Sequence, residues 1–220
     1  MPEEKESTGL CTGCLSKISP LTPHCCSVCG TPFHSSSGID HVCGDCIKNP
    51  PEFTWLRSLF WYHGPIRDLV CDLKFRFKFH TLNAIGALTR KTVFLEEFNE
   101  ALPQMTIVPI PVSRSRMQER GFNQALLMAR EIFPGQTVSY NLLTRKREVR
   151  QQASLSLEER QKNVRGSFLA RDGVRGRKIL LFDDVFTTGS TIKEATRTLL
   201  AAGAVEVRAL TFARTPKKEN

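Results

Sequence analysis

The stretch ILLFDDVFTTGSTI, residues 179–192, constrains the fold of this chain more than any other part of the sequence. It begins with apolar residues typical of a buried strand, continues with the adjacent Asp183 and Asp184, and passes through threonines and a glycine into a helical pattern. Two neighbouring carboxylates at the end of a buried strand repel each other and lose solvation. The pair therefore indicates a bound group that both carboxylates hold.

The residues after the acidic pair are typical of a phosphate-binding loop. Thr187, Thr188, Gly189, Ser190 and Thr191 precede the expected helix, so free backbone N–H groups and the positive end of the helix dipole point at one place. Glycine lets the backbone approach an anion, and the hydroxyls add donors. Neither a Walker A loop nor a dinucleotide GxGxxG pattern is present. A phosphate site next to paired carboxylates indicates a sugar phosphate, whose ribose hydroxyls the carboxylates would hold.

Apolar strands alternate with amphipathic helices after residue 54, which predicts an α/β fold with a parallel sheet flanked by helices. In such sheets the site lies beyond the carboxyl ends of the strands, where both 183–191 and 112–122 are expected as loops. Strands are expected at 55–63, 107–111, 178–183 and 205–213, and helices over 66–73, from Asn123 and from 188–191.

Seven of the eight cysteines lie in the first 46 residues, which in a reducing compartment indicates metal binding. Two CxxC pairs, Cys26 with Cys29 and Cys43 with Cys46, have the spacing of a zinc ribbon. Four thiolates leave no open coordination position, so a structural Zn²⁺ is expected. Two alternatives stand for Cys11 and Cys14: they form half of a second site completed by a histidine such as His24, or they bind no metal.

Two prolines in KNPPEF, residues 48–53, predict a boundary between a cysteine-rich zinc-ribbon head (1–50) and a main domain (51–220). No apolar run reaches membrane-spanning length and the N-terminus lacks a signal-peptide pattern, so a cytoplasmic protein without membrane insertion is expected.

The net charge of +9 is unevenly distributed. Residues 1–60 carry −2 and the remainder carries +11, which indicates either a basic solvated surface or a polyanionic partner. KFRFKF, residues 74–79, alternates basic and aromatic residues. Base stacking next to phosphate pairing requires this composition, although a helix end or a half-buried strand explains it equally well.

The 179–192 stretch resembles the phosphoribosyl pyrophosphate (PRPP) motif of type I phosphoribosyltransferases. The resemblance implies that Asp183 and Asp184 contact the ribose hydroxyls, that residues 187–191 bind the 5-phosphate, and that Mg²⁺ accompanies PRPP. It also implies a pyrophosphate loop at 110–121 and a flexible loop at 144–168, in which Ser156 and Glu159 form a capping box. Anion ligands in the pyrophosphate loop would be Arg114, Arg116 and Arg120, with Gly121 at its turn.

Three features together, VPIPVSRSRMQERGFNQA (108–125), RQQASLSLEERQKNVRGSF (150–168) and the cysteine head, are similar to the ComF family. Members are competence-associated and pair a zinc-ribbon head with a phosphoribosyltransferase domain, so the resemblance implies a role in DNA uptake or DNA utilization. Family heads have four CxxC pairs and this chain has three, which leaves a second zinc open.

Three functions follow from this resemblance and the charge. The first is a PRPP-binding protein that handles single-stranded DNA, with competence or DNA-processing proteins as possible partners. The second is an active phosphoribosyltransferase on an unidentified acceptor, and the third is a PRPP-sensing regulator. No segment identifies the acceptor or a catalytic residue.

Overall fold

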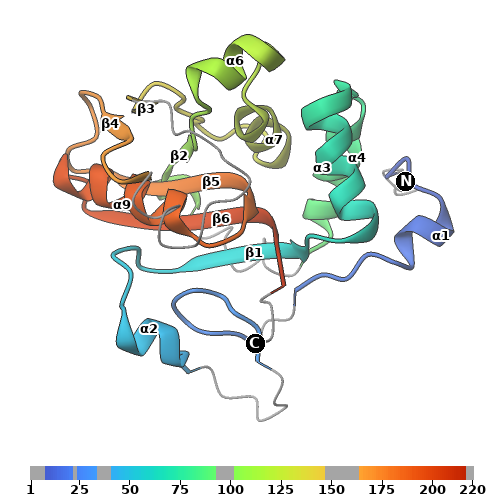
Figure 1. Cartoon of the computed structure of the whole chain (residues 1–220), viewed down its shortest axis with the longest axis horizontal. Coiled ribbons are helices and arrows are strands. Elements are labelled where there is room, and N and C mark those ends of the chain that lie inside the picture. The colour runs from blue at the N-terminus through green and yellow to red at the C-terminus, as the bar shows by residue number, and fades with distance from the viewer. Residues whose placement is uncertain (1–7, 22–23, 34–40, 93–101, 147–163, 217–220) are drawn as a thin grey trace.

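The computed structural model describes residues 8–21, 24–33, 41–92, 102–146 and 164–216. Its centre is a four-stranded parallel sheet in the order β1-β6-β5-β2, with a two-stranded antiparallel ladder of β3 and β4 beside it (Figure 1). This confirms the expected parallel α/β architecture. The strands are β1 (Leu56–Trp61), β2 (Thr106–Pro109), β3 (Leu143–Arg145), β4 (Phe168–Ala170), β5 (Lys178–Phe186) and β6 (Glu206–Arg214).

Strand β5 is longer than the sequence predicts. It was expected to end at Asp183, but Val185 and Phe186 still pair with Ala213 and Arg214 of β6. The paired carboxylates therefore lie within the last four residues of an inner strand. The expected phosphate-binding loop begins only after Phe186.

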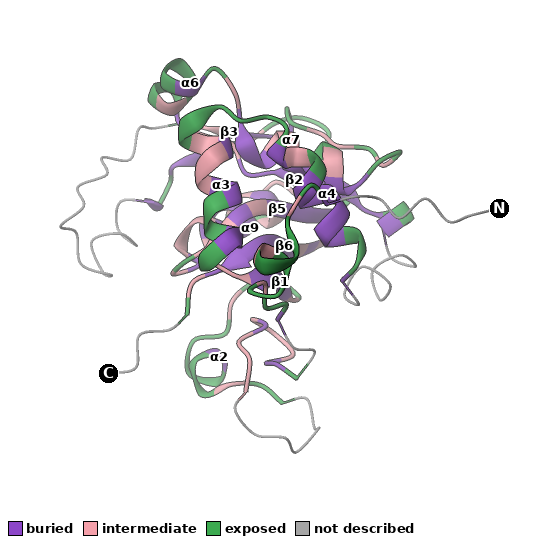
Figure 2. Ribbon diagram, turned by 90° about the vertical axis from the view of Figure 1, so that its right-hand side faces the viewer, coloured by how far each residue is buried: buried purple, intermediate pink, exposed green. Residues whose placement is uncertain are grey.

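Helices cover both faces of the sheet (Figures 1 and 2). The expected helix after Gly64-Pro65 is α3, and Asn123 caps the next predicted helix, α7, by accepting N–H bonds from Ala125 and Leu126. The helices are α1 (Thr12–Leu15), α2 (Gly44–Lys48), α3 (Gly64–Arg76), α4 (Thr81–Arg90), η1 (Leu102–Gln104), α6 (Arg114–Arg120), α7 (Gln124–Ile132) and α9 (Ser190–Ala201).

The expected loop at 112–122 is wrong over most of its length, because residues 114–120 form helix α6. The side chain of Ser113 caps this helix by accepting a hydrogen bond from the Arg116 backbone N–H at 3.3 Å. Gly121 ends the helix with φ 78°, a left-handed conformation that glycine adopts without strain. The arginines of this segment are therefore displayed from a helix.

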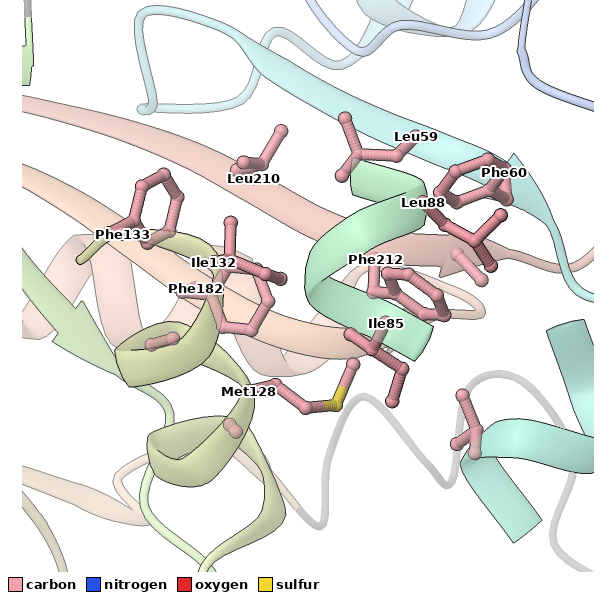
Figure 3. Packing of buried hydrophobic residues seen from close by; sticks show 14 of the residues in the cluster. Leu59, Phe60, Ile85, Leu88, Met128, Ile132, Phe133, Phe182, Leu210 and Phe212 are labelled. Atoms are coloured by element: carbon pink, nitrogen blue, oxygen red, sulfur yellow. The ribbon is translucent and has the colours of Figure 1, made fainter. Parts of the chain in front are cut away.

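The sheet has an apolar core on each face, as strand alternation requires. Leu180 and Phe182 of β5 face a cluster with α3, α4 and α7, whereas Ile179 and Leu181 face a second cluster with α9. Figure 3 shows the first cluster, where Phe182 lies close to Phe133 and Met128. These two cores hold β5 and β6 in place and so fix the position of their carboxyl ends.

The part of the cysteine head that includes α2 lies below β1 in Figure 1, and the head contacts the sheet directly. The Leu56 N–H donates to the Val28 carbonyl at 2.7 Å. Gly30 has φ 61°, and a Cβ there would lie 2.5 Å from the Leu56 carbonyl oxygen, so only glycine allows this approach. The division between residues 50 and 51 stays a prediction.

In the described part of the chain, every helix is too short or too polar to span a membrane.

Candidate sugar-phosphate site and metal centre

The acidic pair on β5 lies in a mostly buried position next to a lysine from α3. Asp184 is 5% exposed, and its Oδ2 forms an ion pair with the Lys74 ammonium. The Lys74 side chain is itself only 16% exposed. Sequence reasoning missed this contact, because it considered Lys74 only as part of KFRFKF, and no spacing signal relates α3 to the end of β5.

The pKa values of the two carboxyls are shifted in opposite directions. Burial raises the pKa of Asp183 well above its usual value, and the charge of Asp184 raises it further. Burial also raises the pKa of Asp184, but the charge and hydrogen bond of Lys74 outweigh burial and the pKa is lowered. One carboxyl is therefore held as a carboxylate while its neighbour binds a proton more tightly than a free aspartate.

The loop that follows β5 has the geometry expected of an anion site at a helix N-terminus. Gly189 precedes the first residue of α9 with φ 75°, and the Thr188 and Ser190 hydroxyls lie 2.9 Å apart. A Cβ on Gly189 would lie 2.7 Å from the Phe186 ring. Glycine is thus required both by the left-handed backbone and by the ring beneath the loop. Thr187 is exposed and Thr191 half-buried at the mouth of the same helix.

The three candidate arginines of α6 differ in position. Arg114 is exposed and Arg116 is half-buried, whereas Arg120 is 9% exposed. Arg120 donates to Gln124 at 3.4 Å, and its guanidinium lies 4.9 Å from the centre of the Phe75 ring. Burial and the charge of Arg116 lower the pKa of Arg120, while the charges of Glu119 and Asp184 raise it. The charge of Asp184 therefore acts on Arg120. Gly121 lies at the turn that ends α6, and its role in binding an anion stays a prediction.

Arg145, which was not among the candidates of the pyrophosphate loop, joins this group from β3. Its guanidinium lies 5.3 Å from the centre of the Phe168 ring. Burial and Arg116 lower the pKa of Arg145, whereas the charge of Asp183 raises it. Lys74 from α3 thus pairs with the acidic pair, and the charges of Arg120 from α6 and Arg145 from β3 act on it, a distribution suited to a ligand with hydroxyls and several phosphates.

The candidate flexible loop begins at β3 and returns at β4. Its residues 147–163, with the predicted capping box of Ser156 and Glu159, lie outside the described residues. The returning end is fixed to α9, because the Gly166 N–H donates to Glu194 Oε1 at 2.7 Å.

The cysteine head brings the four predicted ligands together. The sulfur atoms of Cys26, Cys29, Cys43 and Cys46 all lie within 4.8 Å of one another. Tetrahedral zinc with Zn–S bonds of about 2.3 Å requires sulfurs roughly 3.8 Å apart, so the cluster fits this ion. Cys26 Sγ accepts backbone N–H bonds from Cys29 at 3.4 Å and Cys43 at 3.3 Å. Burial raises the pKa of Cys26, but these donors and the Val28 N–H lower it to about 7.

Cys11 and Cys14 lie apart from this cluster, on and before α1. Among the residues that the structure describes, no histidine or acidic residue, His24 included, joins these two cysteines in a group of three or more possible ligands. The residues that the structure describes therefore provide one complete set of zinc ligands.

Comparisons with known proteins agree with this arrangement. Residues 119–220 match the family described as Phosphoribosyl transferase domain, and residues 2–47 match the Double zinc ribbon domain. The matched double ribbon and the four clustered cysteines together support a structural zinc.

Three relatives extend over nearly the whole chain. Competence protein ComFC of Bacillus subtilis (strain 168) is 30% identical over 97% of this chain and 85% of that protein. DNA utilization protein YhgH of Escherichia coli (strain K12) is 31% identical over 98% of this chain and 94% of that protein. Competence protein F of Haemophilus influenzae is 28% identical over 94% of this chain and 90% of that protein.

Proposed function

Since the chain belongs to the ComF family, we propose that it binds PRPP with Mg²⁺ at the Asp183–Thr191 segment and handles single-stranded DNA during DNA uptake or DNA utilization. The observation that carries the PRPP part is the acidic pair at the end of β5, which is followed directly by the anion loop of α9 and forms an ion pair with Lys74. The charges of Arg120 and Arg145 also act on this pair. The names of the relatives support the DNA part.

Each part of PRPP has a matching group in this arrangement. The 5-phosphate accepts hydrogen bonds from N–H groups and hydroxyls of residues 187–191, which lie at the positive end of the α9 dipole. The ribose hydroxyls donate to the carboxylates, in competition with Lys74. Mg²⁺ would enter on the pyrophosphate and neutralise part of its charge, and Arg116, Arg120 and Arg145 are the protein cations on that side.

Calorimetry with PRPP, with and without Mg²⁺, tests this site. Asp184→Asn removes the charged acceptor and is expected to weaken binding by on the order of 1.5–3 kcal/mol. Asp72→Asn is the matched control, because Asp72 is a carboxylate on α3 that pairs with Arg76 and Lys78 away from the acidic pair. Equal PRPP affinity in wild type and Asp184→Asn would place the ligand elsewhere.

An active phosphoribosyltransferase on an unidentified acceptor is the second candidate. Bond cleavage between ribose and pyrophosphate needs cations on the leaving group, and the arginines from α6 and β3 supply them. Pyrophosphate release in the presence of bases, amines or DNA would support this function. PRPP-dependent binding of a partner protein without pyrophosphate release would instead support the regulator.

The DNA part rests on an exposed aromatic patch formed by Phe75, Phe77, Phe79 and Phe122. The first three are 58%, 48% and 48% exposed, and the rings of Phe77 and Phe79 meet Phe122 edge-on at 6.1 and 5.1 Å. Phe77 has φ 56°, a left-handed conformation that is uncommon for a bulky residue. Strain of this kind is concentrated at functional sites, and exposed rings in a basic domain suit base stacking.

The basic residues of the same segment contribute less than the sequence suggests. Lys74 faces Asp184, so it is not available to a phosphate backbone on the surface. Arg76 and Lys78 both pair with Asp72, at 2.6 and 3.0 Å. The patch therefore offers a DNA strand mainly aromatic surface, with two cations whose charge is partly offset by one carboxylate.

A further inference from the structure

Arg214, the last residue of β6, connects the zinc ribbon to the anion loop. It is 4% exposed. Its Nη1 donates to the carbonyls of Cys29, at 3.2 Å, and Gly30, and its Nη2 donates to the Thr31 hydroxyl at 3.4 Å. That hydroxyl in turn lies 3.1 Å from Cys29 Sγ. One guanidinium thus satisfies the backbone of the CxxC turn that carries Cys29.

The same guanidinium packs on the residue from which the anion loop starts. It lies 4.7 Å from the centre of the Phe186 ring, and the neighbouring Thr215 N–H donates to the Phe186 carbonyl at 3.0 Å. The ring also contacts the loop, because it occupies the space that a Cβ on Gly189 would need. The Phe186 ring therefore contacts both Arg214 and the turn that opens α9.

The position of the Arg214 guanidinium should depend on zinc, because the charge of the zinc–thiolate centre stabilises a buried cation. Four thiolates around one Zn²⁺ carry a net charge of about −2, which stabilises a buried cation beside them. Without zinc the CxxC turn loses the bonds that hold it, since metal binding supplies much of the folding free energy of such modules. The carbonyls that accept from Arg214 would then leave their positions, and a buried guanidinium with unpaired donors is costly.

We propose that Arg214 is a positioning residue that holds the Phe186–Thr191 loop in its phosphate-binding shape by tying Phe186 to the zinc-bearing turn, so that loss of zinc weakens phosphate binding. The inference rests on the proposed PRPP site and gives the zinc head a role in it. Because coupling between binding free energies is reciprocal, PRPP should also raise the affinity of the head for zinc.

Arg57 provides a matched control on the other side of the same turn. Its Nη1 donates to the carbonyls of Cys26 at 3.4 Å and Ser27 at 3.1 Å, so it also satisfies the knuckle backbone. Its guanidinium lies over Trp55 at 5.6 Å, and not over Phe186. An Arg57→Gln variant that keeps its zinc should therefore lose these two knuckle hydrogen bonds without affecting the loop.

The experiment compares full-length wild type, Arg214→Gln, Phe186→Leu and Arg57→Gln, each with its zinc content measured. Hydrogen exchange of the 186–192 amides reports loop order without any ligand, and calorimetry with Mg²⁺ and PRPP reports affinity. Arg214→Gln and Phe186→Leu should exchange faster in this segment and bind PRPP about tenfold more weakly, within the usual range for coupled sites. Arg57→Gln should match wild type in both measurements.

Phe186→Leu keeps the arginine and its bonds to the knuckle, so it carries the test if Arg214→Gln does not fold. Wild-type exchange in the 186–192 segment of a zinc-loaded, folded Phe186→Leu variant would overturn the proposal. So would unchanged exchange in wild type after zinc is removed by a chelator. If wild type binds no PRPP, the proposed function fails, whereas faster exchange in the variants would still support the link between zinc and the loop.

Discussion

The cysteine head and the sheet domain of this chain are stabilised by different means. In the described part of the head, before residue 51, the buried hydrophobic residues are Leu21, Cys25, Cys26 and Cys46, of which only Leu21 is not a cysteine. The sheet domain instead has an apolar cluster on each face of β5. A short segment that buries little apolar surface needs another source of stability, and zinc ligation supplies it. The two regions should therefore fail under different perturbations.

The largest effect is expected from removing one zinc ligand. Cys43→Ser should lose its zinc and unfold the head, because the remaining thiolates cannot complete the tetrahedron. Elemental analysis should give about one zinc per wild-type chain and almost none in the variant. Cys71→Ser is the control, since Cys71 lies on α3 next to the Tyr62 hydroxyl and outside the cluster. Unchanged zinc in Cys43→Ser would refute this ligand set.

A cavity in the sheet domain should lower the stability of the protein and leave its zinc content unchanged. Phe182 is fully buried, and Phe182→Ala should lower the free energy of unfolding by about 3–5 kcal/mol. Zinc content should stay at the wild-type level, because Phe182 lies in the core of the sheet, away from the knuckle. Val205→Ala, at a residue 63% exposed, should change stability by about 0.5 kcal/mol or less in the same urea titration. Loss of zinc from folded Phe182→Ala would show that zinc binding depends on the apolar core of the sheet.

The same contrast explains which features the sequence predicts. The zinc ligands and the anion loop are local patterns, in which the spacing of a few residues fixes the chemistry, and the structure brings the four cysteines together as predicted. Helix α6 was missed although Ser113 followed by good helix formers was a readable signal.

Contacts between distant segments could not be predicted in this way. Lys74 reaches Asp184 because α3 packs against the sheet, and Arg214 reaches Gly30 because the head folds back against β6. Neither contact leaves a spacing in the sequence, since each depends on the tertiary packing of apolar residues elsewhere. The residues that position the site are therefore less predictable than those that form it.

Burying Asp183 as a carboxylate costs folding free energy, which the apolar core of the sheet domain must offset. The folded-state pKa of Asp183 is raised above its usual value, so the folded protein binds this proton more tightly than the unfolded chain. Stability should then fall as the pH rises from the ordinary aspartate pKa through the raised one. Asp183→Asn removes that dependence and should be more stable than wild type at pH 7, whereas exposed Asp172→Asn should behave like wild type. Thermal unfolding from pH 4 to 8 checks this, and a destabilised Asp183→Asn at pH 7 would contradict it.

The smallest effect is expected for the salt dependence of DNA binding when two basic residues are replaced. It tests the charge difference between the head and the sheet domain. Residues 1–60 carry −2 and the remainder +11, so single-stranded DNA should bind the sheet domain. Affinity should fall with salt, with a slope of log K against log salt of about −0.7 per phosphate contacted. Arg76→Gln with Lys78→Gln should flatten that slope by less than the loss of two full contacts, because Asp72 already offsets part of their charge.

Aromatic replacements should separate stacking from charge in the same titration. Phe75→Ala and Phe79→Ala should weaken DNA binding by about 1–3 kcal/mol per stacked base while the salt slope stays unchanged, because no charge is removed. Tyr140→Ala is the control, since Tyr140 is 61% exposed but lies outside the aromatic patch. Fluorescence anisotropy with a labelled oligonucleotide at low and high salt measures both quantities. If wild type binds no DNA at low salt, the basic excess of the sheet domain has another role. If the aromatic variants bind like Tyr140→Ala, the strand follows a different path across this domain.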